Sequence, residues 1–312
     1  MTNLIVAFNV VLPLLICIAL GIFLRSIGMI KDASQKNLNQ LGFKVFLPVH
    51  VFNSIYTTDI AAAFDGKLML FGVLGLVGIF LFLMVLVPVI EKENRLRGVM
   101  VQAIFRSNFV LYGLPVATNL CGEAHLGPTS LLIGIVVPVF NMLSVVCLEW
   151  FRGGKPNFRK MFLGIAKNPL IIGAVVGIAA NLSNITIPTA VHKSIIDIAR
   201  VATPLALIVL GSEFSFSRVR GISKQLIVCV VGKLVVSPLL MVTIGVMLGF
   251  RGDSLVPILM MFGAPTAVSS YTMAQQMDGD ETLAAAAVVF TAGLSIITIF
   301  FAIFLLKQMA LI

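Results

Sequence analysis

The chain has 312 residues, of which 59% are hydrophobic and only 11% are charged. Soluble domains carry about 25% charged residues, so this composition, with a mean hydropathy of +1.08, excludes a water-soluble fold and indicates a multi-pass membrane protein. The net charge of +9 does not require a nucleic-acid partner, because basic residues gather in the cytoplasmic loops of membrane proteins. The four scattered cysteines show no metal-ligand spacing, and we expect no metal and no cofactor.

Ten apolar segments follow one another along the chain, each close to the roughly 20 residues that cross a bilayer as a helix. They cover residues 4–24, 37–57, 68–90, 98–122, 127–151, 168–188, 194–213, 225–250, 254–277 and 282–306. The sequence therefore predicts an all-α polytopic membrane protein with ten transmembrane helices.

Two of these segments carry polar and helix-breaking residues in the middle of an apolar run. The stretch 106–121 reads RSNFVLYGLPVATNLC, and the stretch 262–277 reads FGAPTAVSSYTMAQQM. Within a bilayer, polar groups and interrupted backbone are tolerated only where protein or a water-filled cavity surrounds them. Paired interruptions in corresponding halves are typical of transporter binding sites; proline-kinked helices in a packed bundle are the alternative.

The two halves of the chain repeat each other at an offset of 156 or 157 residues. The corresponding pairs are Pro13 with Pro169, Pro48 with Pro204, Gly122 with Gly279, and Asn108 with Pro265. Because five spans per repeat bring the second copy in from the opposite side, the halves are expected to be inverted. We predict a first five-helix repeat over residues 1–151, a basic cytoplasmic loop over 152–167, and a second, inverted repeat over 168–312.

The basic residues predict the orientation, because Lys and Arg are enriched in cytoplasmic loops. With the N-terminus outside, 14 basic residues fall in the inner loops: Arg25, Lys31, Lys36, Lys92, Arg95, Arg97, Arg152, Lys155, Arg159, Lys160, Lys167, Arg218, Arg220 and Lys224. Four fall outside: Lys67, Lys193, Arg251 and Lys307. We therefore expect a protein of the cell inner (plasma) membrane with both termini outside.

On these residues the chain resembles the auxin efflux carrier family, within the wider group that includes the bile-acid/sodium symporters. The motifs that support this resemblance are Ser107-Asn108-Phe-Val-Leu-Tyr-Gly113-Leu-Pro115, Gly263-Ala-Pro265-Thr266, and the run from Pro204 to Gly211-Ser212-Glu213. The resemblance covers the whole chain. It implies two inverted five-helix repeats, helices 4 and 9 broken and crossing at the midplane, and elevator-type alternating access.

The resemblance also suggests a substrate class, since bacterial members are similar to permeases for malate, malonate and related acids. The chain departs from the family pattern in two ways. The long central hydrophilic loop of the plant carriers is absent, which weakens any inference of auxin specificity. Asn108 stands where the second repeat has Pro265, so the break in helix 4 could rest on Asn108 or on Gly113 and Pro115.

The residues expected to bind substrate are the polar and helix-breaking ones in the two interrupted stretches. They are Arg106, Ser107, Asn108, Tyr112, Gly113, Pro265, Thr266, Ser269, Ser270 and Tyr271. Hydroxyls, amides and the free N–H groups of a helix start can bind a carboxylate; hydroxyls bonded back to their own helices are the alternative. Arg106 could grip a carboxylate in a bidentate fork or extend toward the inner surface.

Four further intramembrane residues are candidates for charge pairing or coupling: Asp197, Arg200, Lys233 and His50. Asp197 and Arg200 stand three residues apart on a helix and can pair on one face. Lys233 has no obvious local partner. His50 could titrate during transport or serve only as a structural hydrogen-bonding group. The coupling ion, Na⁺ or H⁺, is left open.

The sequence thus predicts a secondary transporter of small mono- or dicarboxylates such as malate or malonate, and no catalytic arrangement that would make it an enzyme. A ligand-sensing membrane receptor and a sodium-coupled symporter of a larger amphipathic acid are the alternatives. Its expected partners are a small carboxylate and the lipid bilayer, and not nucleic acid. Glycines at 72, 75, 78, 173 and 177 predict close helix packing, within one protomer or in a homodimer.

Overall fold

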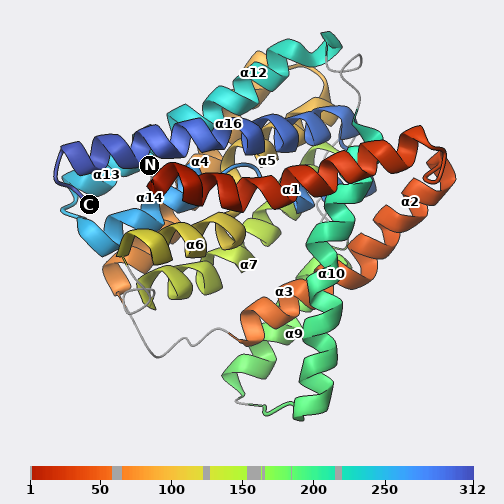
Figure 1. The fold of residues 1–312 in the computed structure, drawn as a ribbon, viewed down its shortest axis with the longest axis horizontal. Helices are drawn as coiled ribbons and strands as arrows, with labels where there is room; N and C mark the ends of the chain where they lie inside the picture. Colours follow the sequence, from red (N-terminus) through yellow and green to blue (C-terminus); the bar gives the residue numbers. More distant parts are fainter. Residues whose placement is uncertain are drawn as a thin grey trace.

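The computed structural model of the protein describes residues 2–57, 65–121, 127–152, 163, 166–183, 185–214 and 220–312. Every regular element in these ranges is a helix (Figure 1). In the first half these are α1 (Thr2–Ser26), α2 (Asp32–Leu41), the π-helical η1 (Gly42–Phe46), α3 (Leu47–Tyr56), α4 (Gly66–Ile90), α5 (Asn94–Phe105), α6 (Phe109–Cys121) and α7 (Gly127–Phe151).

The second half is also helical. It contains α9 (Pro169–Leu182), α10 (Thr189–Glu213), the 3₁₀ turn η3 (Arg220–Ile222), α12 (Ser223–Val231), the π-helical η4 (Gly232–Val236), α13 (Ser237–Met247), the 3₁₀ turn η5 (Gly252–Ser254), α14 (Leu255–Gly263), α15 (Ser269–Gln276) and α16 (Glu281–Gln308). Most of the predicted loop 152–167 lies outside the described residues.

Five stretches of helix in the described part are long and apolar enough to cross a membrane. They are Gly66–Ile90, Leu132–Phe151, Thr189–Glu213, Ser223–Met247 and Glu281–Gln308. On α4 the exposed side chains are themselves large and apolar: Leu70, Leu74, Phe82, Val85 and Val89 are each 60% exposed or more. Such surfaces are stable in lipid rather than in water, and the fold is therefore that of a polytopic membrane protein.

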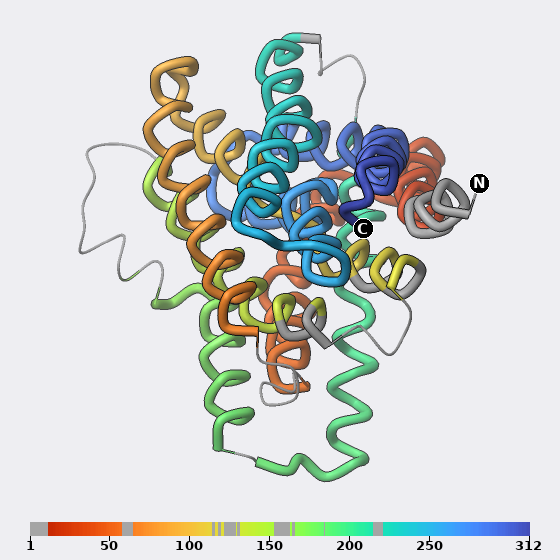
Figure 2. Tube along the Cα trace, turned by 90° about the vertical axis from the view of Figure 1, so that its left-hand side faces the viewer, coloured from red at the N-terminus to blue at the C-terminus, as the bar shows by residue number. Residues whose placement is uncertain are grey.

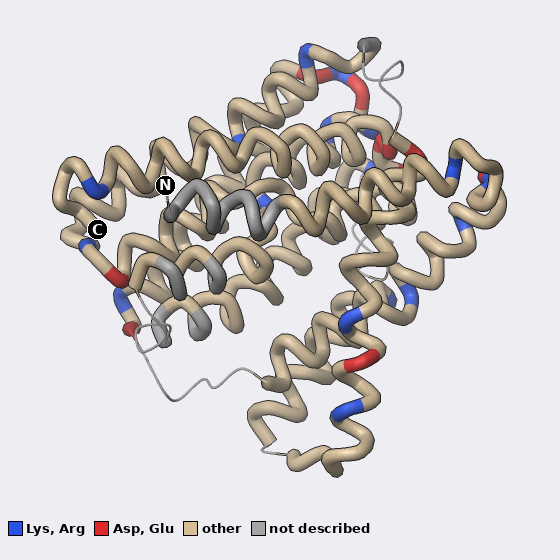
Figure 3. The backbone as a smooth tube through the Cα atoms, in the orientation of Figure 1, with Lys and Arg blue, Asp and Glu red and all other residues tan. Residues whose placement is uncertain are grey.

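Charged residues gather toward the ends of the helices and along α10, and few stand in the middle of the helix stack (Figure 3). Among the described residues, only two charged side chains are buried, those of Arg106 and Lys233. Every other Asp, Glu, Lys or Arg side chain whose burial the structure describes is at least partly exposed. The interior is thus apolar, with two basic exceptions.

The helices form two groups that pack differently. The first group consists of α1, α2, α3, α9 and α10, and the second of α4 to α7 with α12 to α16. In the view of Figure 2, α9 and α10 extend away from the second group. The contact between α1 and α10 is tight because a Cβ on Gly21 would lie 2.1 Å from the Ile208 carbonyl oxygen, and one on Gly211 would lie 2.1 Å from that of Ile18.

The glycines at 173 and 177 pack within the protomer, where the sequence left a dimer contact as the alternative. A Cβ on Gly173 would lie 2.5 Å from the carbonyl oxygen of Pro48, and one on Gly177 would lie 3.0 Å from that of Phe52. Small residues at these positions let α9 lie directly against the backbone of α3. The first group is therefore held together by backbone-to-backbone contacts.

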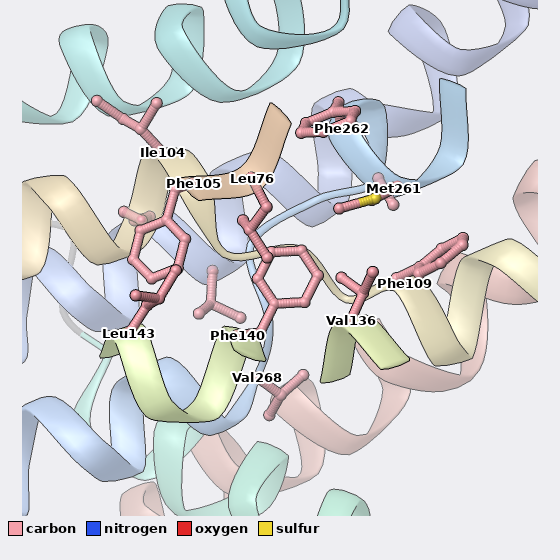
Figure 4. Close-up of a cluster of buried hydrophobic side chains, with 14 of the residues drawn as sticks. Leu76, Ile104, Phe105, Phe109, Val136, Phe140, Leu143, Met261, Phe262 and Val268 are labelled. Carbon is pink, nitrogen blue, oxygen red and sulfur yellow. The ribbon is translucent and has the colours of Figure 1, made fainter. Parts of the chain in front are cut away.

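The second group is centred on a cluster of buried apolar side chains. Figure 4 shows Leu76 of α4, Phe105 at the end of α5, Phe140 of α7 and Phe262 of α14 gathered around it. The rings of Phe105 and Phe140 lie 6.1 Å apart. The cluster thus packs around the points where α5 and α14 end.

Candidate functional site

Both interrupted stretches are broken helices in the structure. Helix α5 ends at Phe105, Arg106 has extended backbone (φ −79°, ψ 127°), and α6 begins at Phe109. Helix α14 ends at Gly263, Ala264 is extended, and α15 begins at Ser269. Proline at 265 accounts for the second break, because it lacks an N–H and disfavours helical backbone in the residue before it.

The first break lies at Asn108 and not at Gly113, which is inside α6 together with Pro115. Of the two explanations the sequence left open, the structure therefore selects the one that rests on Asn108. The backbone N–H of Asn108 donates to the Pro265 carbonyl at 2.8 Å. A helix continuing through Asn108 would need that N–H for its own ladder.

The two breaks cross and bond to each other. Ser107 and Thr266 form an antiparallel bridge. The Ser107 hydroxyl donates to the Ala264 carbonyl at 3.1 Å, and the Thr266 hydroxyl donates to the Ala103 carbonyl at 2.8 Å. These bonds satisfy backbone groups that an interrupted helix leaves free, so each break stabilises the other.

Arg106 emerges from the crossing as a buried cation with neutral partners. The residue is 5% exposed. Its Nη2 donates to Asn141 Oδ1 at 2.6 Å and to Ser269 Oγ at 2.7 Å, and its Nη1 contacts the sulfur of Met273. No carboxylate in the described part of the chain forms an ion pair with it. Since the side chain reaches across to α7 and α15, it does not extend to the inner surface.

A cavity of about 70 Å³ lies beside this guanidinium, where the two helix groups meet. The second group contributes Arg106, residues 108–111 at the start of α6, Asn141 of α7, and residues 267–269 at the start of α15. Helix starts carry free N–H groups and positive dipole character. The walls from this group therefore favour an anion.

The opposite wall comes from α3, α9 and α10 and is mostly apolar. His50 of α3 and Thr203 of α10 are its polar members. The His50 ring also hydrogen-bonds the backbone of Ala199 on α10. This bond ties His50 to its own helix group, so that ring is held in place while it faces the cavity.

Six of the ten predicted binding residues do not line the cavity. Arg106, Ser107, Asn108 and Ser269 line it. Tyr112 points toward Ser295 of α16. Gly113 packs against the Phe109 ring.

Pro265 and Thr266 form the crossing itself, and the Thr266 backbone N–H also donates to the Thr291 hydroxyl oxygen at 3.1 Å. The Ser270 hydroxyl is buried and has no hydrogen-bond partner in the described residues. These side chains do not line the cavity. The sequence alone did not distinguish them from the side chains that do.

Asn141 and Thr203 were missed by the sequence reasoning. Asn141 stands three residues after Pro138 in an apolar helix, and an intramembrane amide of this kind is a functional signal. Thr203 directly precedes Pro204 in α10. Both could have been found by treating every polar residue inside an apolar span as a candidate.

The predicted coupling residues separate into three environments. Asp197 and Arg200 form an exposed ion pair at 3.7 Å on α10, with side chains 58% and 77% exposed, away from the cavity. Lys233 is fully buried in η4, which packs against α5, α14 and α16. Its amine has no hydrogen-bond partner in the described residues. Only His50 of the four faces the cavity.

A second polar cluster joins the two helix groups on the side where α15 ends. Gln35 Nε2 of α2 donates to Glu213 Oε2 of α10 at 2.8 Å and to the Tyr271 hydroxyl of α15 at 2.9 Å. Gln275 Nε2 donates to that hydroxyl at 3.2 Å and to Glu281 Oε2 at 2.8 Å, and Asn39 bonds to the Gln275 amide oxygen. We call these six residues the α2–α15 clasp.

Crossed broken helices that place a buried cation beside a cavity, inside a bundle with lipid-compatible surfaces, define a membrane transporter. The chain belongs to the membrane transport protein family, which it matches over residues 6–303. The resemblance to the auxin efflux carriers is thereby confirmed at the level of the family.

Relatives of similar length carry the same general description. An uncharacterized transporter of Methanothermobacter thermautotrophicus is 24% identical over 295 residues, covering 93% of this chain and 95% of the relative. An uncharacterized transporter of Methanocaldococcus jannaschii is 22% identical over 301 residues, covering 94% and 97%. A protein of Rhizobium meliloti named "Putative malonate transporter" is 24% identical over 210 residues, covering 65% of each chain.

Proposed function

We propose that this protein is a secondary transporter of small organic anions, namely mono- or dicarboxylates such as malonate or malate. The observation that carries the proposal is the Arg106 guanidinium, which is buried beside a cavity and has only neutral hydrogen-bond partners in the described residues. A buried charge is expensive unless it is paired. A carboxylate in the cavity would supply the missing counter-charge through the bidentate geometry that arginine favours.

The cavity volume supports a small substrate. At about 70 Å³ it is well below the roughly 300–1,000 Å³ of pockets that take drug-sized ligands. A short dicarboxylate can be admitted with modest separation of the walls, whereas a large amphipathic acid needs a much wider opening. The relative named for malonate supports the same class of substrate.

The arrangement of the helices supports alternating access by an elevator movement. The cavity lies between the first and second helix groups, so sliding of one group past the other would carry the bound anion across the membrane. The element order is compatible with ten spans in two inverted repeats. In this scheme the fourth span is α5 with α6, the ninth is α14 with α15, and both termini are outside the plasma membrane.

Uptake of labelled malonate and malate into proteoliposomes tests the proposal. We expect accumulation that unlabelled malonate inhibits and that protein-free liposomes lack. Malonate binding to the purified protein without uptake would favour a membrane receptor and contradict a transporter. Uptake of a bulky amphipathic acid in place of both small acids would contradict the proposed substrate class.

A further inference from the structure

The buried side chains of Asp, Glu, Lys or Arg in the described part of the chain are all basic. In the ranges that the structure describes, Arg106 and Lys233 are the buried charged residues, and no Asp or Glu side chain is buried. The two acidic residues outside those ranges, Asp59 and Glu123, fall between the apolar segments of the sequence. Among the described residues, the buried interior therefore holds two basic side chains and none of the carboxylates that commonly take up a coupling cation.

Both buried basic residues belong to the second helix group, and Arg106 lies at the crossing itself. Arg106 occupies the break between α5 and α6. Lys233 lies in η4, which packs against α5, α14 and α16. A sodium ion entering this region would be repelled by the guanidinium across a low-dielectric medium, whereas an anion would be attracted.

Arg106 cannot remove its own charge, because a guanidinium stays protonated in proteins. Its partners Asn141 and Ser269 are neutral and belong to the same helix group. If that group moves relative to the first, the charge moves with it. An empty carrier would then have to carry an unpaired cation past the apolar wall formed by α3, α9 and α10, which is costly inside a membrane.

A bound carboxylate removes that cost, because it neutralises the guanidinium at the point where the two helix groups meet. We propose that the transported anion is itself the obligatory counter-ion of Arg106, so that the protein works as an anion exchanger. One carboxylate enters as another leaves, and neither Na⁺ nor H⁺ is a co-substrate. This inference rests on the proposed function and extends it to the mode of transport.

The test compares exchange with net uptake, with malonate as the probe. Proteoliposomes are filled either with unlabelled malonate or with buffer alone, and labelled malonate is added outside. The buffer-filled vesicles are measured with an inward Na⁺ gradient, with an inward H⁺ gradient, and with a potassium-valinomycin potential positive inside. All initial rates are taken at the same protein density.

We expect rapid labelling of the malonate-filled vesicles. Net uptake into buffer-filled vesicles should be slower by about two orders of magnitude under all three gradients, because this factor corresponds to the insertion cost of an unpaired arginine at mid-membrane. Net uptake at the exchange rate, or a gradient of Na⁺ or H⁺ that restores it, would overturn the inference while leaving the proposed function intact. Absence of labelling in both kinds of vesicle would instead contradict the proposed function.

The variants Arg106→Gln and Arg106→Lys test whether the charge of Arg106 causes the preference for exchange over net uptake. Arg106→Lys keeps the charge and should keep the preference for exchange. In Arg106→Gln the empty carrier no longer holds a cation at this place, so the ratio of exchange to net uptake should fall toward one even where both rates are reduced. The Arg200→Gln variant removes an exposed arginine and should keep the wild-type ratio; equal ratios in all four proteins would count against Arg106 as the cause.

Discussion

The α2–α15 clasp is predicted to keep the cavity closed on the side where α15 ends, and Gln35→Leu tests this directly. The substitution removes two hydrogen bonds between the helix groups, one of 2.8 Å to the Glu213 carboxylate and one of 2.9 Å to the Tyr271 hydroxyl. Hydrogen bonds to charged groups contribute about 1.5–3 kcal/mol and those to neutral groups about 0.5–1.5 kcal/mol.

Because Glu213 is only half-buried, we take the lower end of both ranges, which gives about 2 kcal/mol. A difference of that size changes the ratio of closed to open forms by roughly thirtyfold. In the variant, the Glu213 carboxylate and the Tyr271 hydroxyl lose their bonds to Gln35 and are hydrated in the open form. This hydration further favours the open form.

The assay follows a single cysteine introduced at Thr203, which lines the cavity, in a background without the four native cysteines. Its labelling by a membrane-impermeant maleimide is measured in inside-out vesicles. Gln35→Leu should raise the labelling rate by up to about thirtyfold. Gln40→Leu, the same change at an exposed position of α2, should leave it unchanged. Equal rates in both variants would show that the clasp does not control access to the cavity.

Three further outcomes follow from the same structure. Pro265→Ala and Asn108→Leu should both insert and fold but lose most malonate binding by calorimetry, because each favours a continuous helix through the crossing; wild-type affinity in both would mean that the breaks are packing kinks. Gly211→Ala should lower the free energy of unfolding by about 1–3 kcal/mol in thermal melts, because its Cβ would lie 2.1 Å from the Ile18 carbonyl oxygen, whereas Gly78→Ala meets nothing within 4 Å and should be tolerated. A cysteine at Lys155 should resist the impermeant maleimide in intact cells while one at Gly252 reacts; the reverse pattern would invert the proposed orientation.

Much of the fold could be predicted from hydropathy, because the long spans of α4 and α16 are nearly continuous hydrophobic runs. The two breaks were also predictable, since Pro265 and a polar run inside an apolar segment are local signals. The start of α2 was missed. This helix begins at Asp32 and has a polar composition, yet its residues Gln35 and Asn39 are buried against α10 and α15. Hydropathy cannot identify a helix whose buried face is made of amide side chains.

The site could be predicted only in part, because the direction in which each polar side chain faces depends on three-dimensional packing. Arg106 and Ser269 lie 163 residues apart, and their contact follows from the crossing of the two breaks, which the repeat suggested. Which way each hydroxyl faces depends on the rotation of short helices about their axes. Tyr112, Thr266 and Ser270 are polar residues of the right stretches, but their side chains lie behind the crossing, and only the three-dimensional packing shows this.

The central claim is that the Arg106 guanidinium binds the carboxylate of the substrate, and calorimetric titration of malonate into purified Arg106 variants tests it most directly. We expect Arg106→Gln to weaken binding about ten- to hundredfold, the effect of losing a charge-assisted hydrogen bond. Arg106→Lys should be intermediate, because lysine keeps the charge without the bidentate fork. The exposed-arginine control Arg200→Gln should bind as the wild type does. Malonate affinity that is the same in the wild type and in both Arg106 variants would contradict the claim.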